Sequence, residues 1–210
     1  GGGDRAFSSG FDVTAIPTDV SPEMAEILKT TNPLTLGLES VRNYPYPVIA
    51  MMNGYAFGAG LNLAICCDIR IAVDTIKVGM PPARLGLVYA SEGLKQFCDV
   101  LGSARTREVF FTGRTYQGGE VLEAGFVNRL VPAAELESAT LGMAGEIAGN
   151  APLSLKGMKE ILNLLDRNPE LPQGDLERAE TLVKQCFASK DLAEGQAAFL
   201  EKRPPVFRGE

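Results

Sequence analysis

The sequence predicts an α/β layer followed by a helical tail, and two observations carry this prediction. Short apolar runs that are typical of buried strands alternate with helical patterns up to about residue 131. Beyond that point, apolar residues recur only at helical spacing. We therefore expect an α/β core over residues 1–132 and a helical region over residues 133–210.

In the first half, residues 4–7 predict a short strand and residues 8–12 predict a turn. Residues 21–43 predict a helix in two pieces, because Pro33 does not fit a helix interior. The run PVIAMM is continuously apolar and is typical of a strand buried on both faces. Together with this run, the strands expected here cover residues 47–52, 68–73 and 76–78.

The second half predicts one more strand, over residues 126–131. The helices expected before and after it cover residues 91–101, 104–112, 118–124, 133–149, 152–166, 174–188 and 191–202. The tail carries an apolar stripe that predicts packing on the core or on a sister subunit. Its members are Leu153, Leu155, Met158, Ile161, Leu162 and Leu165.

Composition excludes several classes of function. The 210 residues carry a net charge of −6, so non-specific binding to nucleic acid is not expected. No stretch approaches the roughly 18 apolar residues that a membrane span needs, and we expect a soluble, cytoplasmic protein. The chain has no histidine, which excludes a Ser-His-Asp site and any metal site built on imidazole. No metal and no separate cofactor are expected.

The four cysteines, Cys66, Cys67, Cys98 and Cys186, form no CxxC pair and show no spacing typical of a secreted disulfide framework. We interpret them as reduced, buried thiols.

Residues 47–72 (PVIAMMNGYAFGAGLNLAICCDIRIA) carry the most informative motif, a strand, a glycine-rich turn and a short helix. Glycines let backbone approach a ligand, and the free N–H groups of a helix start favour a developing negative charge. A dinucleotide fingerprint fits less well, because its third glycine position holds Leu63 and Gly58 lies several residues after the strand. A glycine turn with a purely structural role is the other alternative.

The segment NGYAFGAGLNLAICCD (residues 53–68) resembles the oxyanion-hole motif of the crotonase superfamily, the enoyl-CoA hydratases and isomerases. RAFSSGFD (residues 5–12) resembles its upstream partner motif, and residues 115–132 and 194–207 resemble two downstream segments. The resemblance covers essentially the whole chain in register. Family members usually have several tens of residues before the RAFSSG-like segment, so we expect a fragment or an omitted N-terminal segment.

This resemblance implies a spiral of ββα units with a C-terminal helical trimerisation region, assembled as a homotrimer or a dimer of trimers. The implied substrate is an acyl-CoA, with coenzyme A present as part of the substrate. The amides of Phe11 and Ala59 would form the oxyanion hole for the thioester oxygen. The segment Phe11, Asp12, Val13 and Thr14 would line the path of the thioester and pantetheine, and Arg5 and Lys202 would lie near the CoA phosphates.

The two positions that carry glutamate in typical hydratases hold Asn62 and Pro82 in this sequence. An amide cannot exchange a proton near neutral pH, and a proline side chain has no ionisable group. General acid–base help is worth roughly 10²–10⁴-fold, so ordinary two-carboxylate hydration is not expected.

Decarboxylation of a malonyl-type thioester needs an oxyanion hole and a proton donor, but no base. The stretch RLGLVY (residues 84–89) resembles that of methylmalonyl-CoA decarboxylases, which carry a tyrosine at the position of Tyr89 but a histidine where Phe11 stands. Glu92 is the nearest carboxylate, which keeps an atypical hydratase or isomerase open. A non-catalytic acyl-CoA-binding or assembly homologue is the alternative from another class.

Overall fold

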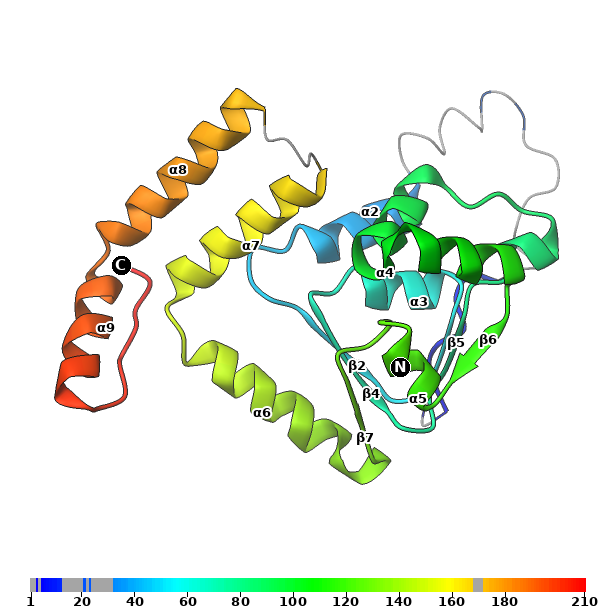
Figure 1. Ribbon diagram of the computed structural model, residues 1–210, viewed down its shortest axis with the longest axis horizontal. Coiled ribbons are helices and arrows are strands. Elements are labelled where there is room, and N and C mark those ends of the chain that lie inside the picture. Colours follow the sequence, from blue (N-terminus) through cyan, green and yellow to red (C-terminus); the bar gives the residue numbers. More distant parts are fainter. Residues whose placement is uncertain (1–2, 4, 13–20, 22, 24–31, 168–171) are drawn as a thin grey trace. The chain divides into compact units, whose positions relative to one another are not determined.

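The computed structural model describes residue 3 and residues 5–12, 21, 23, 32–167 and 172–210 (Figure 1). The chain forms two compact units. The first, called the α/β unit, comprises residues 1–42 and 48–140; the second, called the helical unit, comprises residues 43–47 and 141–210. The boundary between the units falls inside helix α6 (Leu136–Ala148). Residues 43–47, from the first half of the chain, belong to the helical unit.

Two small sheets form the centre of the α/β unit. The four-stranded sheet has the order β1-β3-β5-β6, and the three-stranded sheet has the order β2-β4-β7. All neighbouring strands are parallel except β5 and β6. The strands are β1 (Ala6–Ser8), β2 (Ile49–Met52), β3 (Tyr55–Phe57), β4 (Ile69–Val73), β5 (Lys77–Gly79), β6 (Thr115–Gln117) and β7 (Arg129–Val131).

Consecutive strands change sheet at tight corners. Strands β2 and β3 are joined by only Asn53 and Gly54, and β4 and β5 by only residues 74–76, yet each pair is split between the two sheets. A helical segment follows each pair: α3 (Ala59–Ile65) after β3, and the 3-10 turn η2 (Pro82–Leu85) with α4 (Ser91–Thr112) after β5. This is a repeated ββα arrangement.

The core of the α/β unit is filled by the predicted apolar runs, and Met52, Leu61, Ile71 and Phe97 have no exposed surface. Strand β2 differs from its prediction: Ala50 and Met52 are buried, but Met51 between them is 41% exposed. Only one face of this strand packs within the unit, so burial on both faces was wrong for β2.

Two helix boundaries follow from local sequence. Helix α2 (Pro33–Arg42) begins at the predicted break, where the Asn32 side chain accepts a hydrogen bond from Leu34 N at 3.0 Å. The predicted piece before it lies largely outside the described residues. Helix α4 contains a kink at Gly102, whose φ of 74° and ψ of 161° are not helical. The kink lies between the two helices predicted over residues 91–101 and 104–112.

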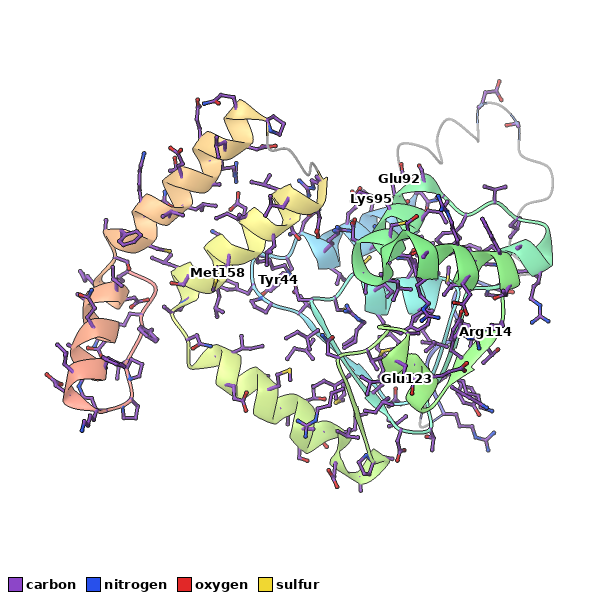
Figure 2. The ribbon with its side chains drawn as sticks, viewed as in Figure 1. Tyr44, Glu92, Lys95, Arg114, Glu123 and Met158 are labelled. Carbon is purple, nitrogen blue, oxygen red and sulfur yellow. The ribbon has the colours of Figure 1, made fainter. Side chains whose placement is uncertain are left out.

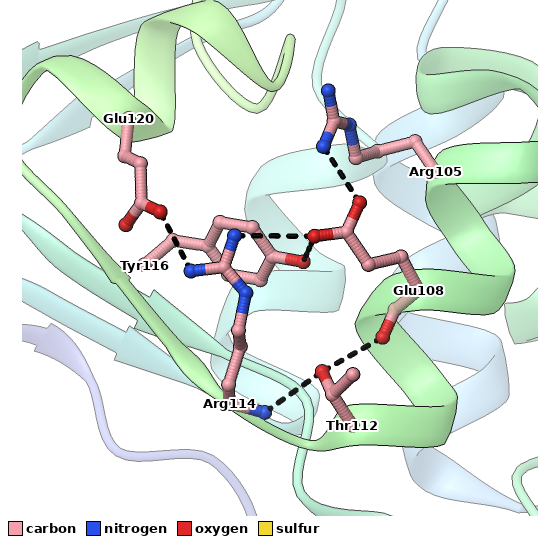
Figure 3. A network of polar contacts seen from close by, with 6 residues as sticks. All are labelled: Arg105, Glu108, Thr112, Arg114, Tyr116 and Glu120. Carbon is pink, nitrogen blue, oxygen red and sulfur yellow. Dashed lines mark hydrogen bonds and ion pairs between the residues drawn. The ribbon is translucent and has the colours of Figure 1, made fainter.

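A polar cluster joins the second half of α4 to β6 and to α5 (Gly119–Glu123) (Figure 3). The Arg114 guanidinium lies 3.8 Å above the Tyr116 ring and forms ion pairs with Glu108 at 3.1 Å and Glu120 at 2.6 Å. Hydrogen bonds from Arg114 lower the pKa of both carboxylates. The cluster is partly exposed, so its role is to orient these elements more than to stabilise them.

The α/β unit contains the same strand–glycine–helix turn twice. Gly58 connects β3 to α3 with φ 52° and ψ −125°, and Gly118 connects β6 to α5 with φ 55° and ψ −133°. Only glycine adopts such a conformation readily. Neither β3 nor β6 was predicted, because the glycine-rich turn pattern around Tyr55–Phe57 masks the first, and the second has a single buried residue, Tyr116.

The helical unit contains the tail helices, whose predicted positions are close to those observed. Residues 43–47 join it through a hydrogen bond from Lys159 Nζ to the Tyr46 carbonyl at 3.0 Å. The carboxylate of Asp191 accepts hydrogen bonds from the amides of Arg208 and Gly209, which fixes the last residues on their helix. Of the tail elements, η3 (Ala133–Glu135) and the start of α6 (Leu136–Ala148) belong to the α/β unit. The rest of α6, α7 (Pro152–Arg167), α8 (Gln173–Phe187) and α9 (Lys190–Glu201) belong to the helical unit. No helix in the described part of the chain has both the length and the apolar character needed to cross a bilayer.

Glycine at position 60 is required by a backbone contact. A Cβ atom there would lie 2.5 Å from Ser8 Cβ and from the Ser8 carbonyl oxygen, whereas a Cβ at Gly37 of α2 would meet nothing within 4 Å. We expect Gly60→Ala to lower the free energy of unfolding by about 1–3 kcal/mol. Gly37→Ala, the control in another helix of the same unit, should raise it by about 0.5–1 kcal/mol. Urea unfolding followed by circular dichroism measures both, and equal stabilities would contradict the contact.

Candidate active site

The ends of three neighbouring parallel strands bring distant residues to one edge of the four-stranded sheet. Strand β1 ends at Ser8, β3 at Phe57 and β5 at Gly79. Phe11 follows the first strand, Ala59 the second and Pro82 the third. The carboxyl ends of parallel strands are where α/β proteins commonly bind ligands.

Two glycines allow the segment after β1 to lie directly on the turn after β3. A Cβ at Gly10 would come within 2.5 Å of the Phe57 carbonyl oxygen and 3.1 Å of the Ala59 nitrogen, and Gly60 touches Ser8 in the same way. Phe11 and Ala59 are thereby brought to adjacent backbone. Within the residues that the structure describes, neither the Phe11 amide nor the Ala59 amide has a hydrogen-bond acceptor.

Helix α3 begins at Ala59, so the Ala59 N–H belongs to the first turn, where no intrahelical acceptor exists. The backbone N–H of Asn62 donates a hydrogen bond to the Gly58 carbonyl oxygen at 3.0 Å, which closes this first turn. Phe11 is an exposed side chain, and its relevant group is the main-chain N–H.

A buried polar network connects Asn62 to the loop before α4. The Tyr89 hydroxyl donates to Asn62 Oδ1 at 2.8 Å, and Asn62 Nδ2 donates to Gln96 Oε1 at 2.6 Å. The Cys66 thiol donates to the same Gln96 oxygen at 3.3 Å. Asn62 has no exposed surface. The sequence pointed to Tyr89 and Asn62, but it gave no indication that Gln96 and Cys66 complete the network.

Tyr89 is held in place by packing as well as by this bond. Its ring lies 5.5 Å from that of Phe110, and a Cβ at Gly93 would lie 2.3 Å from Tyr89 Cε1. Burial raises the pKa of Tyr89 to about 12, and burial raises the pKa of the Cys66 thiol to about 12 as well. Both groups are therefore neutral hydrogen-bond donors at neutral pH.

Two further positions from the sequence analysis, Pro82 and Glu92, differ in their exposure to solvent. Pro82 is buried at the start of η2. Glu92 is exposed in the first turn of α4, beside Lys95 (Figure 2). A carboxylate at a helix start is also favoured by the helix dipole alone.

The predicted coenzyme A contacts fall in several places. Arg5 is exposed in the α/β unit, and its carbonyl accepts a hydrogen bond from Tyr55 N at 3.1 Å. Asp12 is also exposed, whereas Val13 and Thr14 lie outside the described residues. Lys202 ends α9 in the helical unit, with a left-handed φ of 53° and an exposed side chain. The structure describes no group of three or more side chains that could hold a metal ion.

Comparison with known proteins identifies the family. The family model described as "Enoyl-CoA hydratase/isomerase" matches residues 1–210. A carnitinyl-CoA dehydratase of Escherichia coli O157:H7 is 34% identical over 212 residues, and the match covers 100% of this chain and 79% of that protein.

Solved structures of the same kind share the fold. An enoyl-CoA hydratase from Bacillus anthracis superposes with a TM-score of 0.87 at 29% identity, covering 99% of this chain and 79% of that chain. An enoyl-CoA hydratase/carnithine racemase from Magnetospirillum magneticum superposes with a TM-score of 0.88 at 32% identity, covering 100% and 76%. The crotonase-like α/β fold with its C-terminal helices, predicted from the sequence, is confirmed. The chain belongs to the enoyl-CoA hydratase/isomerase family of enzymes.

Proposed function

We propose that this protein binds an acyl-CoA thioester and stabilises its enolate between the amides of Phe11 and Ala59. The observation that carries the proposal is the contact of Gly10 with the turn from Phe57 to Ala59, which brings two amides without an acceptor onto adjacent backbone. Each N–H directed at a developing oxyanion is worth roughly 3–4 kcal/mol. Side chains at these two positions take no part, so phenylalanine and alanine are both compatible with the role.

Decarboxylation of a malonyl-type acyl-CoA is the reaction that these residues favour. The bond to the carboxylate breaks, CO₂ leaves, and the electron pair enters the thioester enolate, whose oxygen the two amides bind. The α-carbon then takes a proton from the Tyr89 hydroxyl, and the phenolate regains one from water. A phenol with a pKa of about 12 holds its proton until a base as strong as an enolate is present. No step requires a carboxylate at Asn62 or Pro82.

Dehydration, hydration or isomerisation is the second candidate, with Glu92 as the proton-transferring group. The observation in its favour is the 34% identity to carnitinyl-CoA dehydratases over the whole chain. Glu92 lies three residues after Tyr89, in the first turn of α4, and its exposed side chain is accessible to a substrate near Tyr89. A protein that binds acyl-CoA without turnover is the alternative outside catalysis.

The coenzyme A moiety enters this proposal as part of the substrate. Asp12, Val13 and Thr14 would follow the pantetheine from the oxyanion hole, and Arg5 and Lys202 would pair with phosphates. Exposed guanidinium and ammonium groups suit that task. We also propose the cytoplasm as the compartment, since all four cysteines are free thiols.

The oxyanion hole can be tested by deleting one donor. Proline is tolerated at the first position of a helix, so Ala59→Pro should remove the N–H while leaving α3 folded. We expect kcat to fall by about 10²–10³-fold. Gly119→Pro is the matched control, because Gly119 opens α5 after a glycine with nearly the same φ and ψ. The assay uses full-length protein with malonyl-CoA, methylmalonyl-CoA, crotonyl-CoA and 3-hydroxybutyryl-CoA. Equal kcat values for the two variants would refute the role of Ala59.

The reaction type can be tested at the loop before α4. If decarboxylation is the reaction, Tyr89→Phe should slow turnover of methylmalonyl-CoA by about 10²-fold or more, whereas Glu92→Gln should have little effect. If hydration or isomerisation is the reaction, Glu92→Gln should remove most turnover of crotonyl-CoA. Tyr116→Phe, which removes another buried tyrosine hydroxyl, is the control. Wild-type rates in both the Tyr89 and the Glu92 variants would show that neither residue transfers the proton.

We further propose that copies of the chain assemble through the helical unit into a trimer or a dimer of trimers. Phe187 is 73% exposed and Phe199 83% exposed, and both line an apolar groove of about 440 Å³. Apolar surface of this kind is commonly covered by a partner. Sedimentation of the full-length protein should give a multiple of three, and Phe199→Asp should reduce it, with exposed Phe111→Asp in the α/β unit as the control. A monomer at micromolar concentration would contradict the proposal.

A further inference from the structure

A row of four polar side chains runs between α3 and α4, which pack against each other (Figure 1). It begins at Tyr89, passes through the amides of Asn62 and Gln96, and ends at the Cys66 thiol. Asn62 is fully buried, and Gln96 is 7% exposed. Buried polar groups almost always have hydrogen-bond partners, and these two amides bond to each other.

The direction of each bond in the row depends on the next one. Gln96 presents its oxygen to Asn62, so Asn62 must donate with Nδ2 and present Oδ1 to Tyr89. The Tyr89 proton is thereby committed to Asn62. Its hydroxyl has one proton, which cannot be donated to a substrate at the same time.

The hydrogen bonds of this row can also run in the opposite donor–acceptor direction, with every group still paired. If Gln96 turns its amide nitrogen toward Asn62, then Asn62 accepts with Oδ1 and donates with Nδ2 to the Tyr89 oxygen. The Tyr89 proton is then available to a substrate. The Cys66 thiol fits both arrangements, because its sulfur can donate or accept weakly and burial keeps it protonated.

We propose that Gln96 is a positioning residue that determines, through Asn62, whether the Tyr89 hydroxyl directs its proton to Asn62 or to the substrate. This inference rests on the proposed function only for its effect on turnover. Its geometric part, the dependence of Tyr89 on Gln96, stands on the hydrogen bonds alone.

Several ionisable groups from the surrounding elements face or neighbour this row. Arg42 of α2 and Arg70 of β4 act on Cys66 and lower its pKa, but less than burial raises it. Cys67 also acts on Cys66, and Cys66 acts on Tyr89; both cysteines directly follow α3. Arg84 lies on η2, and Glu92, Lys95 and Asp99 lie on α4 together with Gln96.

The variant Gln96→Glu tests which hydrogen-bond direction the row adopts, because it restricts the row to one of the two. An ionised carboxylate can only accept, so it fixes Asn62 with Oδ1 toward Tyr89. A protonated carboxyl group can also donate, so the reverse direction returns at low pH. Gln96→Met has similar length but neither donates nor accepts strongly, and it is the matched control. Circular dichroism and elution volume establish that both variants fold like the wild type.

The first measurement is the ionisation of Tyr89, followed as tyrosinate absorbance after a rapid rise in pH and taken as the difference from the same protein with Tyr89→Phe. We expect Gln96→Glu to raise the pKa of Tyr89 above the wild-type value, because Asn62 can no longer donate to the phenolate and a negative charge lies near. Gln96→Met should not raise it. Equal Tyr89 pKa values in the two variants would overturn the inference, whatever their activity.

The second measurement is the pH dependence of kcat for methylmalonyl-CoA. In Gln96→Glu, kcat should fall by at least about 10-fold as the new carboxyl group ionises, with KM nearly unchanged, and the wild type and Gln96→Met should lack this pH-dependent decrease. A uniform loss in both variants would mean that Gln96 acts only in packing. A shifted Tyr89 pKa without any change in kcat would contradict the proposed role of Tyr89 as proton donor, and would leave the inference on Gln96 supported.

Discussion

The contact between two glycine-containing backbone segments is the constraint on which the candidate site depends. The segment after β1 lies on the turn after β3 because Gly10 and Gly60 have no side chains. With a Cβ at either position, atoms of the opposite backbone would lie at 2.5 Å, and the segments would have to separate. The parallel register of β1 with β3 aligns these segments, and the tight corners between the sheets make this register possible. The geometry of the candidate site is thus set by contacts between backbone segments and not by side chains.

The second determinant is a hydrogen-bonded network of groups that are neutral at ordinary pH. By the family resemblance, Asn62 and Pro82 stand where typical hydratases carry glutamates. Asn62 is hydrogen-bonded to the half-buried Tyr89 and to the buried Gln96, which also accepts from the Cys66 thiol. Burial disfavours the charged forms of the tyrosine and the thiol, so the pKa of each is raised to about 12. A site of this kind binds and donates hydrogen bonds over a wide pH range. Chemistry that begins by removing a proton would need a base from elsewhere, such as Glu92.

How far the sequence predicts this structure depends on the range of each interaction. The order of strand, glycine turn and helix over residues 47–67 is local, and it predicts α3 and its free N–H groups within two residues. Strands β3 and β6 are defined by their pairing with strands that lie far away in the sequence, and their own residues were not recognised as strands. Gln96 was missed for the same reason: its partner Asn62 is 34 residues away, and a glutamine in a helix has no distinctive local context. Cys66 was interpreted only as a reduced buried thiol, which it is.

The repeated turn has a consequence for how such sites arise. Gly58 and Gly118 have nearly identical backbone angles, and each is followed by the start of a short helix. The loop after β1 lies against the first turn through Gly10 and Gly60, whereas a Cβ at Gly118 or Gly119 of the second turn would come no closer than 3.5 Å to an opposing segment. In the proposed oxyanion hole, the turn therefore supplies only half of the geometry, and the opposing loop supplies the other half. To build a second site of the proposed kind into this protein, an engineer would leave residues 116–120 unchanged and graft a glycine-containing loop opposite them.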